Sequence, residues 1–210
     1  GRWQELQRQA TTAQLYDVDV RILNKDQIKK DYPIINTDEV IGGILMPGDG
    51  AADPSGVTHM LAKGARKHGA QIFEKSPVDE ILTKDGKISG VKVNGHKIAC
   101  EYIVLSSGMW SRQIGEKAGV SIPLYPAEHF YIITEPIENL SKTLPVIRDF
   151  DNRTYIKEDA GKILVGIFEG NSIPAWNKTN RVPENFSFGE FQENFEHFEP
   201  YLASAIKRFP

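Results

Sequence analysis

Residues 53–69 carry the strongest structural signal in the chain, a helix with both of its ends marked. Asp53 is a suitable N-cap, Pro54 fits the first helical position, and Gly69 fits the position that ends a helix. Between these ends, apolar residues recur every three or four positions, as they do on one face of an amphipathic helix. We therefore predict one amphipathic helix here, within a longer organising stretch from Gly42 to Gly119.

The residues after this helix alternate strand-like runs with turns. Three runs are predicted as strands: Gln71–Phe73, Val78–Thr83 and Ile103–Leu105. The Asp-Gly pair in Lys84–Lys87 and the Asn-Gly pair in Asn94–Lys97 are typical of hairpin turns, so a β-meander is expected. After the last run, a small-residue turn opens a helix at Trp110–Lys117. Such a turn presents backbone N–H groups, which suits a bound nucleotide or phosphate.

Composition excludes several classes of protein. The chain has 210 residues, 40% hydrophobic residues and a net charge of −3, which fits an ordinary globular chain with one core or two small ones. The sequence contains no sustained stripe of basic residues, so its charge pattern does not indicate nucleic acid as a partner. Cys100 is the only cysteine, so no internal disulfide framework is possible. The sequence has no apolar run long enough to span a membrane and no signal-peptide pattern. We expect a cytoplasmic location, or the mitochondrial matrix in a eukaryote. No metal site is predicted.

The hydrophobic pattern of the sequence changes from Ser121 onward. Alternating β-type runs, LYPAEHFYIITEP, TYIKED and ILVGIF, predict an antiparallel sheet. Near the N-terminus, Asn24 and Gln27 form a weak capping box for a short helix at Lys25–Lys30. Near the C-terminus, phenylalanines at roughly helical spacing predict an amphipathic helix from Ser187, followed by a second short helix in YLASAIKRFP.

The motifs PGDGAADP, KHGA and IVLSSGMWS, in this order, resemble those of FAD-dependent oxidoreductases of the D-amino-acid oxidase or glycine oxidase type. The likeness extends from Trp3 to about Trp176 and is greatest to dimethylglycine and sarcosine dehydrogenases. It implies an α/β fold with three parts. Residues 1–40 are then a connecting segment at the start of the substrate domain, residues 41–120 are part of a Rossmann-like FAD-binding domain with an inserted β-meander, and residues 121–210 are part of an antiparallel substrate-binding domain.

The segment Gly48–Asp53 nearly matches a dinucleotide-binding fingerprint, but Asp53 stands where the third glycine is needed. A carboxylate at the start of a helix would also repel a pyrophosphate. We therefore interpret the segment as a turn followed by an N-cap. Because the glycine-rich FAD loop of the family is absent, we expect an internal fragment of a longer oxidoreductase, inactive and free of flavin by itself.

The resemblance implies a set of site residues. For FAD, the backbone of Val78 would meet the adenine, although a plain core strand residue is an equal alternative, and Ser107, Gly108 and Trp110 would lie near the dinucleotide. For catalysis, His129 stands in the position of the histidine in the family's HQY motif and would help the amine lose a proton, while Tyr155 would orient the amine. Arg148 could bind a substrate carboxylate, or it could form an ordinary surface salt bridge.

Two classes of function follow from the resemblance. In the first, the chain is part of an enzyme that demethylates an N-methylated glycine derivative, such as dimethylglycine or sarcosine, by hydride transfer to FAD. Its partners are then the small amine and an electron acceptor, either oxygen or an electron-transfer flavoprotein. In the second, the chain is a non-catalytic relative, like the regulatory subunit of pyruvate dehydrogenase phosphatase.

Overall fold

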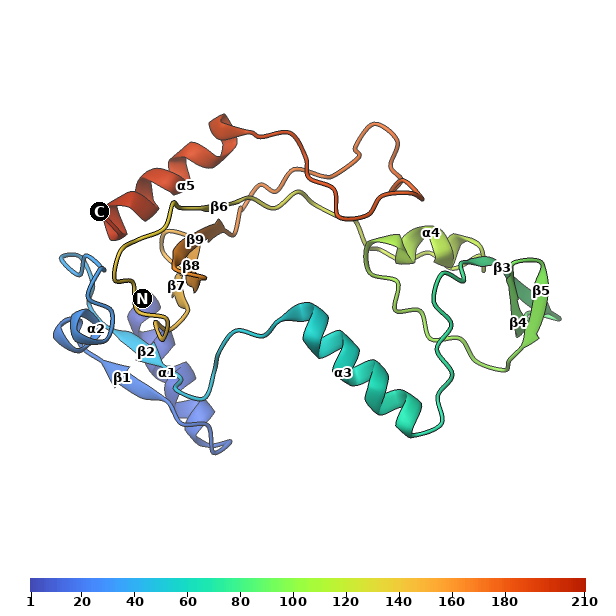
Figure 1. The fold of residues 1–210 in the computed structure, drawn as a ribbon, viewed down its shortest axis with the longest axis horizontal. Helices are drawn as coiled ribbons and strands as arrows, with labels where there is room; N and C mark the ends of the chain where they lie inside the picture. Colours follow the sequence, from blue (N-terminus) through green and yellow to red (C-terminus); the bar gives the residue numbers. More distant parts are fainter. The chain divides into compact units, whose positions relative to one another are not determined.

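The computed structural model describes residues 1–210, which divide into two compact units (Figure 1). Unit 1 comprises Gly1–Ala52, His129–Asn171 and Gln192–Pro210, and unit 2 comprises Asp53–Glu128 and Ser172–Phe191. None of the helices combines the length and the apolar character needed to span a membrane. The domain boundaries expected near residues 40 and 120 stay a prediction, because these units group residues by contact within this chain only.

Unit 1 is built around a four-stranded antiparallel sheet. Its elements are α1 (Arg2–Gln14), β1 (Arg21–Leu23), α2 (Lys25–Asp31), β2 (Gly43–Leu45), β6 (Tyr131–Ile133), β7 (Ile147–Asp149), β8 (Thr154–Asp159), β9 (Lys162–Ile167) and α5 (Phe195–Arg208). The sheet has the order β6-β9-β8-β7, and β1 pairs separately with β2. The antiparallel sheet expected after Ser121 is therefore confirmed.

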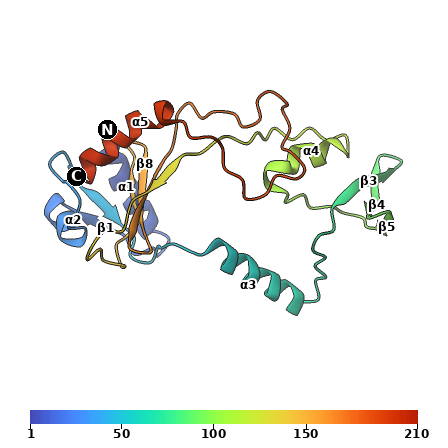
Figure 2. The ribbon, with the colours of Figure 1, turned by 45° about the horizontal axis from the view of Figure 1, so that its top comes forward.

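One face of this sheet forms the core of unit 1. Along β8, Thr154 and Ile156 are almost completely buried, because alternate side chains of a strand point to the same face. Ile156 packs with Ile163 and Val165 of β9 and with Ala205 of α5. Figure 2 shows α5 beside β8, in agreement with this packing. Tyr155, which lies between Thr154 and Ile156 on β8, therefore points to the opposite face of the sheet.

The N-terminal helix signals are also confirmed. The Asn24 side chain accepts hydrogen bonds from the backbone N–H groups of Asp26 and Gln27, while the Gln27 side chain accepts one from the N–H of Asn24. This reciprocal capping box satisfies N–H groups that the first helical turn leaves without partners. Helix α2 therefore begins at Lys25, as the sequence predicts.

Unit 2 contains the helix with marked ends and the meander. Its elements are α3 (Pro54–Lys67), β3 (Val78–Lys84), β4 (Lys87–Val93), β5 (His96–Ala99), the 3-10 turn η1 (Gly108–Trp110) and α4 (Ser111–Glu116). The Asp53 carboxylate accepts from the N–H groups of Ser55 and Gly56, at 3.2 and 2.8 Å, which confirms the predicted N-cap. Strands β3, β4 and β5 form an antiparallel meander whose two tight turns have positive φ at both central residues.

Two of the predicted strands in unit 2 are wrong. Gln71–Phe73 and Ile103–Leu105 belong to no strand, and Phe73 and Val104 are 70% and 88% exposed. A strand requires a neighbouring segment that accepts its hydrogen bonds, and no segment of the described chain pairs with either run. Apolar runs alone could not reveal whether such a neighbour exists.

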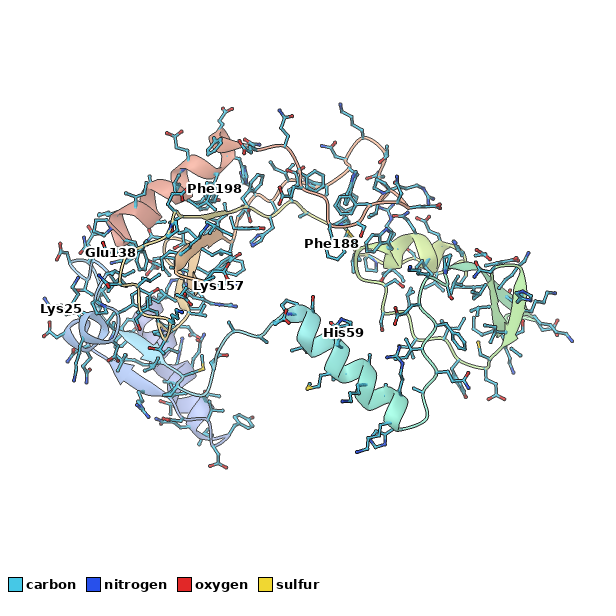
Figure 3. All side chains as sticks on the ribbon, viewed as in Figure 1. Lys25, His59, Glu138, Lys157, Phe188 and Phe198 are labelled. Carbon is cyan, nitrogen blue, oxygen red and sulfur yellow. The ribbon has the colours of Figure 1, made fainter.

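The phenylalanine-rich segment also differs from expectation. The rings of Phe186 and Phe191 lie 4.9 and 5.1 Å from the ring of Trp176, and Phe188 is fully exposed with a φ of 49° (Figure 3). The helix α5 begins only at Phe195, after Asn194 accepts a hydrogen bond from the N–H of His197. It then continues to Arg208, so the two predicted helices are one. Aromatic packing, rather than helical periodicity, explains the first part of the pattern.

Candidate functional site

The face of the unit 1 sheet opposite Ile156 carries the candidate catalytic side chains. Because Thr154 and Ile156 point into the core, Tyr155 points to the opposite face. Across the sheet, Tyr155 pairs with Arg148 of β7 and with Gly166 of β9, and Gly166 pairs in turn with Tyr131 of β6. Directly paired residues share a face, so these four positions form one row across the sheet.

Gly166 makes room for the Tyr155 ring. A Cβ atom at position 166 would overlap the ring and hydroxyl of Tyr155, so the tyrosine lies directly over the glycine. A glycine inside a strand commonly marks such a close approach. The glycine in the run ILVGIF is thus a signal for the site that the sequence analysis did not use.

His129 and Tyr155, the two predicted catalytic residues, lie next to each other. His129 Nε2 is 3.2 Å from the Tyr155 hydroxyl, and the two rings are nearly parallel, with 5.8 Å between their centroids. His129 comes just before β6, and β9 lies between β6 and β8 in the sheet. Sheet pairing therefore brings together two side chains that are 26 positions apart in the sequence.

Glu169 lies on the other side of the His129 ring. Its Oε2 atom is 3.4 Å from His129 Nδ1, and its side chain is only 2% exposed, while that of His129 is 45% exposed. The sequence analysis missed this residue, because an acidic residue just after a strand resembles any surface charge. The imidazole is thus placed between a buried carboxylate and a phenol.

The electrostatic surroundings favour the neutral form of Tyr155. Burial raises the pKa of the Tyr155 hydroxyl, and the nearby Tyr131 and Glu169 raise it further. A raised phenol pKa means that Tyr155 keeps its proton at neutral pH. The hydroxyl can therefore act as a hydrogen-bond donor, either to His129 or to a bound molecule.

Phe168 and Arg148 extend this cluster. The Phe168 ring lies 5.2 Å from the Tyr155 ring and 5.9 Å from the His129 ring. The Arg148 guanidinium lies 5.4 Å from the centre of the Phe168 ring, at a distance typical of a cation–π contact. Arg148 forms no ion pair, so the surface salt bridge considered for it is absent. Its charge remains available to a carboxylate.

The predicted FAD-contacting residues lie in unit 2. Gly108 is exposed and has a φ of 51°, in the left-handed region that favours glycine, and an added Cβ there would meet no atom within 4 Å. Ser107 precedes it, and Trp110 Nε1 donates to the carbonyl of Pro183. The space over Gly108 is therefore open, while the backbone N–H of Trp110 already donates to the carbonyl of Ser107.

Val78 begins β3 and is linked to the end of α4. Lys117 Nζ donates to the carbonyl oxygens of Val78 and Asp79, both at 3.1 Å. This contact ties the start of the meander to the helix that follows the Ser107–Trp110 turn. The roles of Val78, Ser107, Gly108 and Trp110 at a cofactor stay predictions.

The start of α3 does not fit the pyrophosphate of a dinucleotide. The Asp53 carboxylate already occupies the N–H groups of Ser55 and Gly56 that an anion would need. The pyrophosphate of FAD therefore does not fit at the start of α3, while contacts to the Ser107–Trp110 turn stay a prediction. No group of three or more His, Cys, Asp or Glu side chains in the structure is arranged to hold a metal ion.

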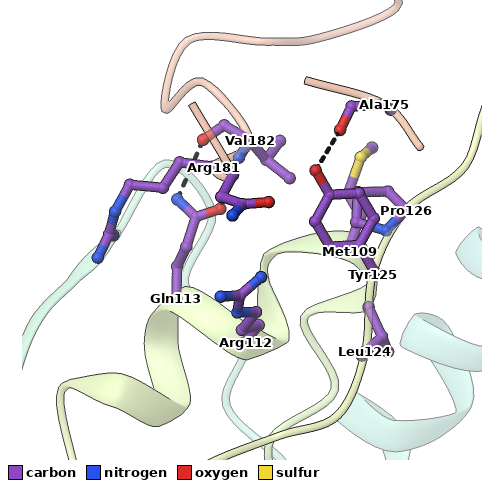
Figure 4. A pocket seen from close by; sticks show the side chains of 10 residues that line it. Met109, Arg112, Gln113, Leu124, Tyr125, Pro126, Ala175, Arg181 and Val182 are labelled. Atoms are coloured by element: carbon purple, nitrogen blue, oxygen red, sulfur yellow. Dashed lines mark hydrogen bonds between the residues drawn. The ribbon is translucent and has the colours of Figure 1, made fainter. Parts of the chain in front are cut away.

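A shallow pocket in unit 2 lies between α4 and the segment around residues 175–182 (Figure 4). The Gln113 side chain donates to the carbonyl of Val182 and accepts from its N–H group, at 3.0 and 2.8 Å. The Tyr125 hydroxyl donates to the carbonyl of Ala175 at 2.9 Å. Because these polar groups already bind each other, the pocket wall is best explained as a structural joint within unit 2.

Comparison with known proteins gives consistent relatives. The chain is 36% identical to 4-methylaminobutanoate oxidase (formaldehyde-forming) from Paenarthrobacter nicotinovorans over 98% of its length. It is 32% identical to the mitochondrial sarcosine dehydrogenase of Homo sapiens over its full length, and 32% identical to the mitochondrial pyruvate dehydrogenase phosphatase regulatory subunit of Mus musculus over 90% of its length. The chain spans only 22–24% of these three proteins, about a quarter of their length.

A solved structure and a family match agree with these relatives. The crystal structure of L-proline dehydrogenase from P. horikoshii superimposes with a TM-score of 0.74 and 26% identity, covering 92% of this chain and 49% of that one. The model of the protein family described as FAD dependent oxidoreductase (DAO) matches residues 1–210. Since this match covers the whole sequence, the chain belongs to the DAO family of FAD dependent oxidoreductases.

Proposed function

We propose that the chain is part of an FAD-dependent enzyme that oxidises the N-methyl group of a small amino acid, such as sarcosine or dimethylglycine. The observation that carries this proposal is the pairing of His129 with Tyr155, 3.2 Å apart on one sheet face, in a chain of the DAO family. Two of the relatives are named for activity on sarcosine and on 4-methylaminobutanoate. Both compounds combine an N-methyl amine with a carboxylate, so this combination defines the substrate class.

The roles of the side chains follow from their chemistry. An amine gives up a hydride only when its nitrogen is neutral, and histidine can take a proton from an ammonium group near neutral pH. His129 therefore accepts the proton of the substrate ammonium, directly or through the Tyr155 hydroxyl. Tyr155, which keeps its proton, orients the amine. FAD, when bound, supplies the acceptor for the hydride.

Arg148 provides a candidate anchor for the substrate carboxylate. Its guanidinium has no carboxylate partner, and Phe168 supports it on the same face as Tyr155. A planar guanidinium can bind a carboxylate through two parallel hydrogen bonds. In this arrangement the carboxylate lies at Arg148 and the amine lies toward His129 and Tyr155, which favours amines that carry an acid group.

The proposal is tested with the full-length protein and its flavin. Sarcosine and dimethylglycine should be turned over with release of formaldehyde, and their carboxamides should react more slowly. Replacing His129 by alanine should lower kcat/KM by about 10²–10⁴-fold, the usual range for an acid–base group. His59→Ala, on the exposed face of α3, is the matched control and should leave turnover unchanged. Full activity of the His129→Ala variant with flavin bound would remove His129 from the mechanism.

A regulatory function is the alternative, supported by the similarity to the pyruvate dehydrogenase phosphatase regulatory subunit. The two functions differ in one measurable respect. If the flavin-loaded protein turned over none of the N-methyl amines, the regulatory function would be favoured. Electron transfer from a substrate to oxygen or to an electron-transfer flavoprotein would favour the enzyme and identify its acceptor.

A further inference from the structure

Glu169 is the one nearly inaccessible acidic side chain beside the candidate catalytic pair. Its two oxygen atoms have different partners. Oε1 accepts a hydrogen bond from the backbone N–H of Phe130 at 3.2 Å, and Oε2 faces Nδ1 of His129 at 3.4 Å. One carboxylate therefore accepts a hydrogen bond from the backbone just before β6 and also lies beside the imidazole ring of His129.

The chemistry of this contact determines which ring nitrogen carries the proton. An ionised carboxylate can only accept hydrogen bonds, whereas a neutral imidazole has one N–H and one bare nitrogen. If Nδ1 were bare, its lone pair would face a buried carboxylate oxygen, and neither atom would have a proton to share. The arrangement that satisfies both groups places the proton on Nδ1 and leaves Nε2 as an acceptor.

The position of Tyr155 agrees with the same arrangement. Nε2 of His129 faces the Tyr155 hydroxyl at 3.2 Å, and a bare Nε2 can accept the hydroxyl proton. The hydroxyl has a proton to donate at neutral pH, since burial and the neighbouring Tyr131 and Glu169 raise its pKa. The donated protons thus point in one direction, from the Tyr155 hydroxyl to Nε2 of His129 and from Nδ1 of His129 to Glu169.

We propose that Glu169 is a positioning residue that fixes the orientation and the tautomer of His129, so that the bare Nε2 faces Tyr155. The geometric part of this inference stands on the distances alone, while its consequence for catalysis rests on the proposed function. In that function, Nε2 is the atom that takes the substrate proton. A His129 ring with the other tautomer could not take it there.

The tautomer is measurable without any turnover. In the full-length protein labelled with [15N]histidine, the neutral ring of His129 should show the spectrum of the Nδ1–H tautomer, assigned by its loss in a His129→Gln variant. Glu169→Gln should keep this tautomer, because the amide oxygen can still accept from Nδ1–H. Glu169→Leu should shift the ring toward the Nε2–H form. Glu138→Gln, a change at an exposed position of unit 1, is the matched control.

The tautomer of His129 in the wild-type protein tests the proposal even if the Glu169→Leu variant folds poorly. An Nε2–H tautomer of His129 in the wild-type protein would contradict it. So would an unchanged Nδ1–H spectrum in a folded Glu169→Leu variant.

Kinetics then separate this proposal from the proposed function. Glu169→Leu should lower kcat about 10²-fold or more with a smaller change in KM, since a histidine held in the wrong tautomer fails as a base. Glu169→Gln should recover most of that loss, which a purely structural carboxylate would not predict. If His129→Ala is fully active while wild-type His129 is Nδ1–H, the function fails and the positioning contact stands. If His129→Ala is inactive while wild-type His129 is Nε2–H, the positioning role fails and the function stands.

Discussion

Strand β8 of unit 1 and helix α3 of unit 2 both have one apolar face in their sequence, but only the strand buries it. Ile156 on β8 is 0% exposed, whereas Met60 and Leu61 on α3 are 62% and 63% exposed. The strand packs against β9 and α5, while α3 buries none of its residues. In these two elements periodicity indicates the type of element and the face that it can bury, but burial itself depends on a second surface.

The first and largest prediction tests this contrast directly. Ile156→Ala should lower the local free energy of unfolding of β8 by about 2–5 kcal/mol, because it removes a fully buried side chain and leaves a cavity. Leu61→Ala, on the exposed side of α3, should change stability by less than about 0.5 kcal/mol. Hydrogen exchange of the β8 and α3 peptides in the folded protein measures both. An equal loss for Leu61→Ala would show that another surface covers α3 after all.

The reliable part of the sequence-based prediction was the local part. Caps and turns depend on residues that are close in the sequence, so Asp53, Asn24 and the two Asx-Gly turns were interpreted correctly. The strands predicted at Gln71–Phe73 and Ile103–Leu105 were wrong, because their pairing requires segments that local sequence does not describe. The helix predicted from the phenylalanine pattern does not begin at Ser187 for a related reason, since Phe186 and Phe191 pack against Trp176 rather than along one face of a helix.

For the site, the resemblance identified residues that the local pattern could not have joined. His129 and Tyr155 lie on segments that only the sheet order β6-β9-β8 brings together. Glu169, Phe168 and Gly166 complete the cluster but carry no motif of their own. A glycine in mid-strand is the one signal among them that could have been used. Their roles become visible only from the register of β8 and β9.

The second prediction concerns the polar support of the buried side of unit 1. Asp149 accepts hydrogen bonds from Asn152 and Arg208, and the Asp149 and Arg208 side chains are only 12% and 14% exposed. Burial acts to raise the pKa of Asp149, but the hydrogen bonds from Asn152 and the charge of Arg208 outweigh it, so the pKa is lowered. A lowered pKa means that the carboxylate stabilises the fold at higher pH. This contribution is lost as the pH falls below about 4 toward the pKa of the folded state.

Asp149→Asn should therefore cost about 1–3 kcal/mol at neutral pH, because it removes the charge of the carboxylate that forms an ion pair with the largely buried Arg208 guanidinium. The cost should shrink as the pH falls through the acid range, where the wild-type carboxyl is also protonated. Hydrogen exchange or chemical denaturation as a function of pH measures the effect. Asp85→Asn in the exposed β3–β4 turn of unit 2 is the control and should show neither change. A cost for Asp149→Asn that did not vary with pH would argue against the charge as its cause.

The third prediction has the smallest effect and concerns a polar atom that unit 1 buries without a partner. Tyr32 is 1% exposed, its ring meets the edge of the Phe209 ring at 5.7 Å, and its hydroxyl has no hydrogen-bond partner. Burial, with a contribution from Glu158, raises the pKa of Tyr32 to about 12. A raised pKa in an acid means that the folded state holds its proton more tightly than the unfolded chain. Ionisation of this phenol in the unfolded chain therefore begins to lower the stability of the fold above about pH 10, and the loss continues as the pH rises through about 12.

Tyr32→Phe keeps the ring contact and removes only the unpaired hydroxyl. At neutral pH the variant should be as stable as the wild type, or more stable by up to about 1 kcal/mol, because a buried donor without a partner is removed. Above about pH 10 the variant should gain relative to the wild type, since it has no phenol to ionise on unfolding. Tyr102→Phe, at an 86% exposed ring in unit 2, is the matched control and should change stability little at neutral pH. A clear loss of stability in Tyr32→Phe at neutral pH would show that the hydroxyl has a bound partner, such as a water molecule, and that unit 1 satisfies its buried polar atoms more completely than its side chains alone indicate.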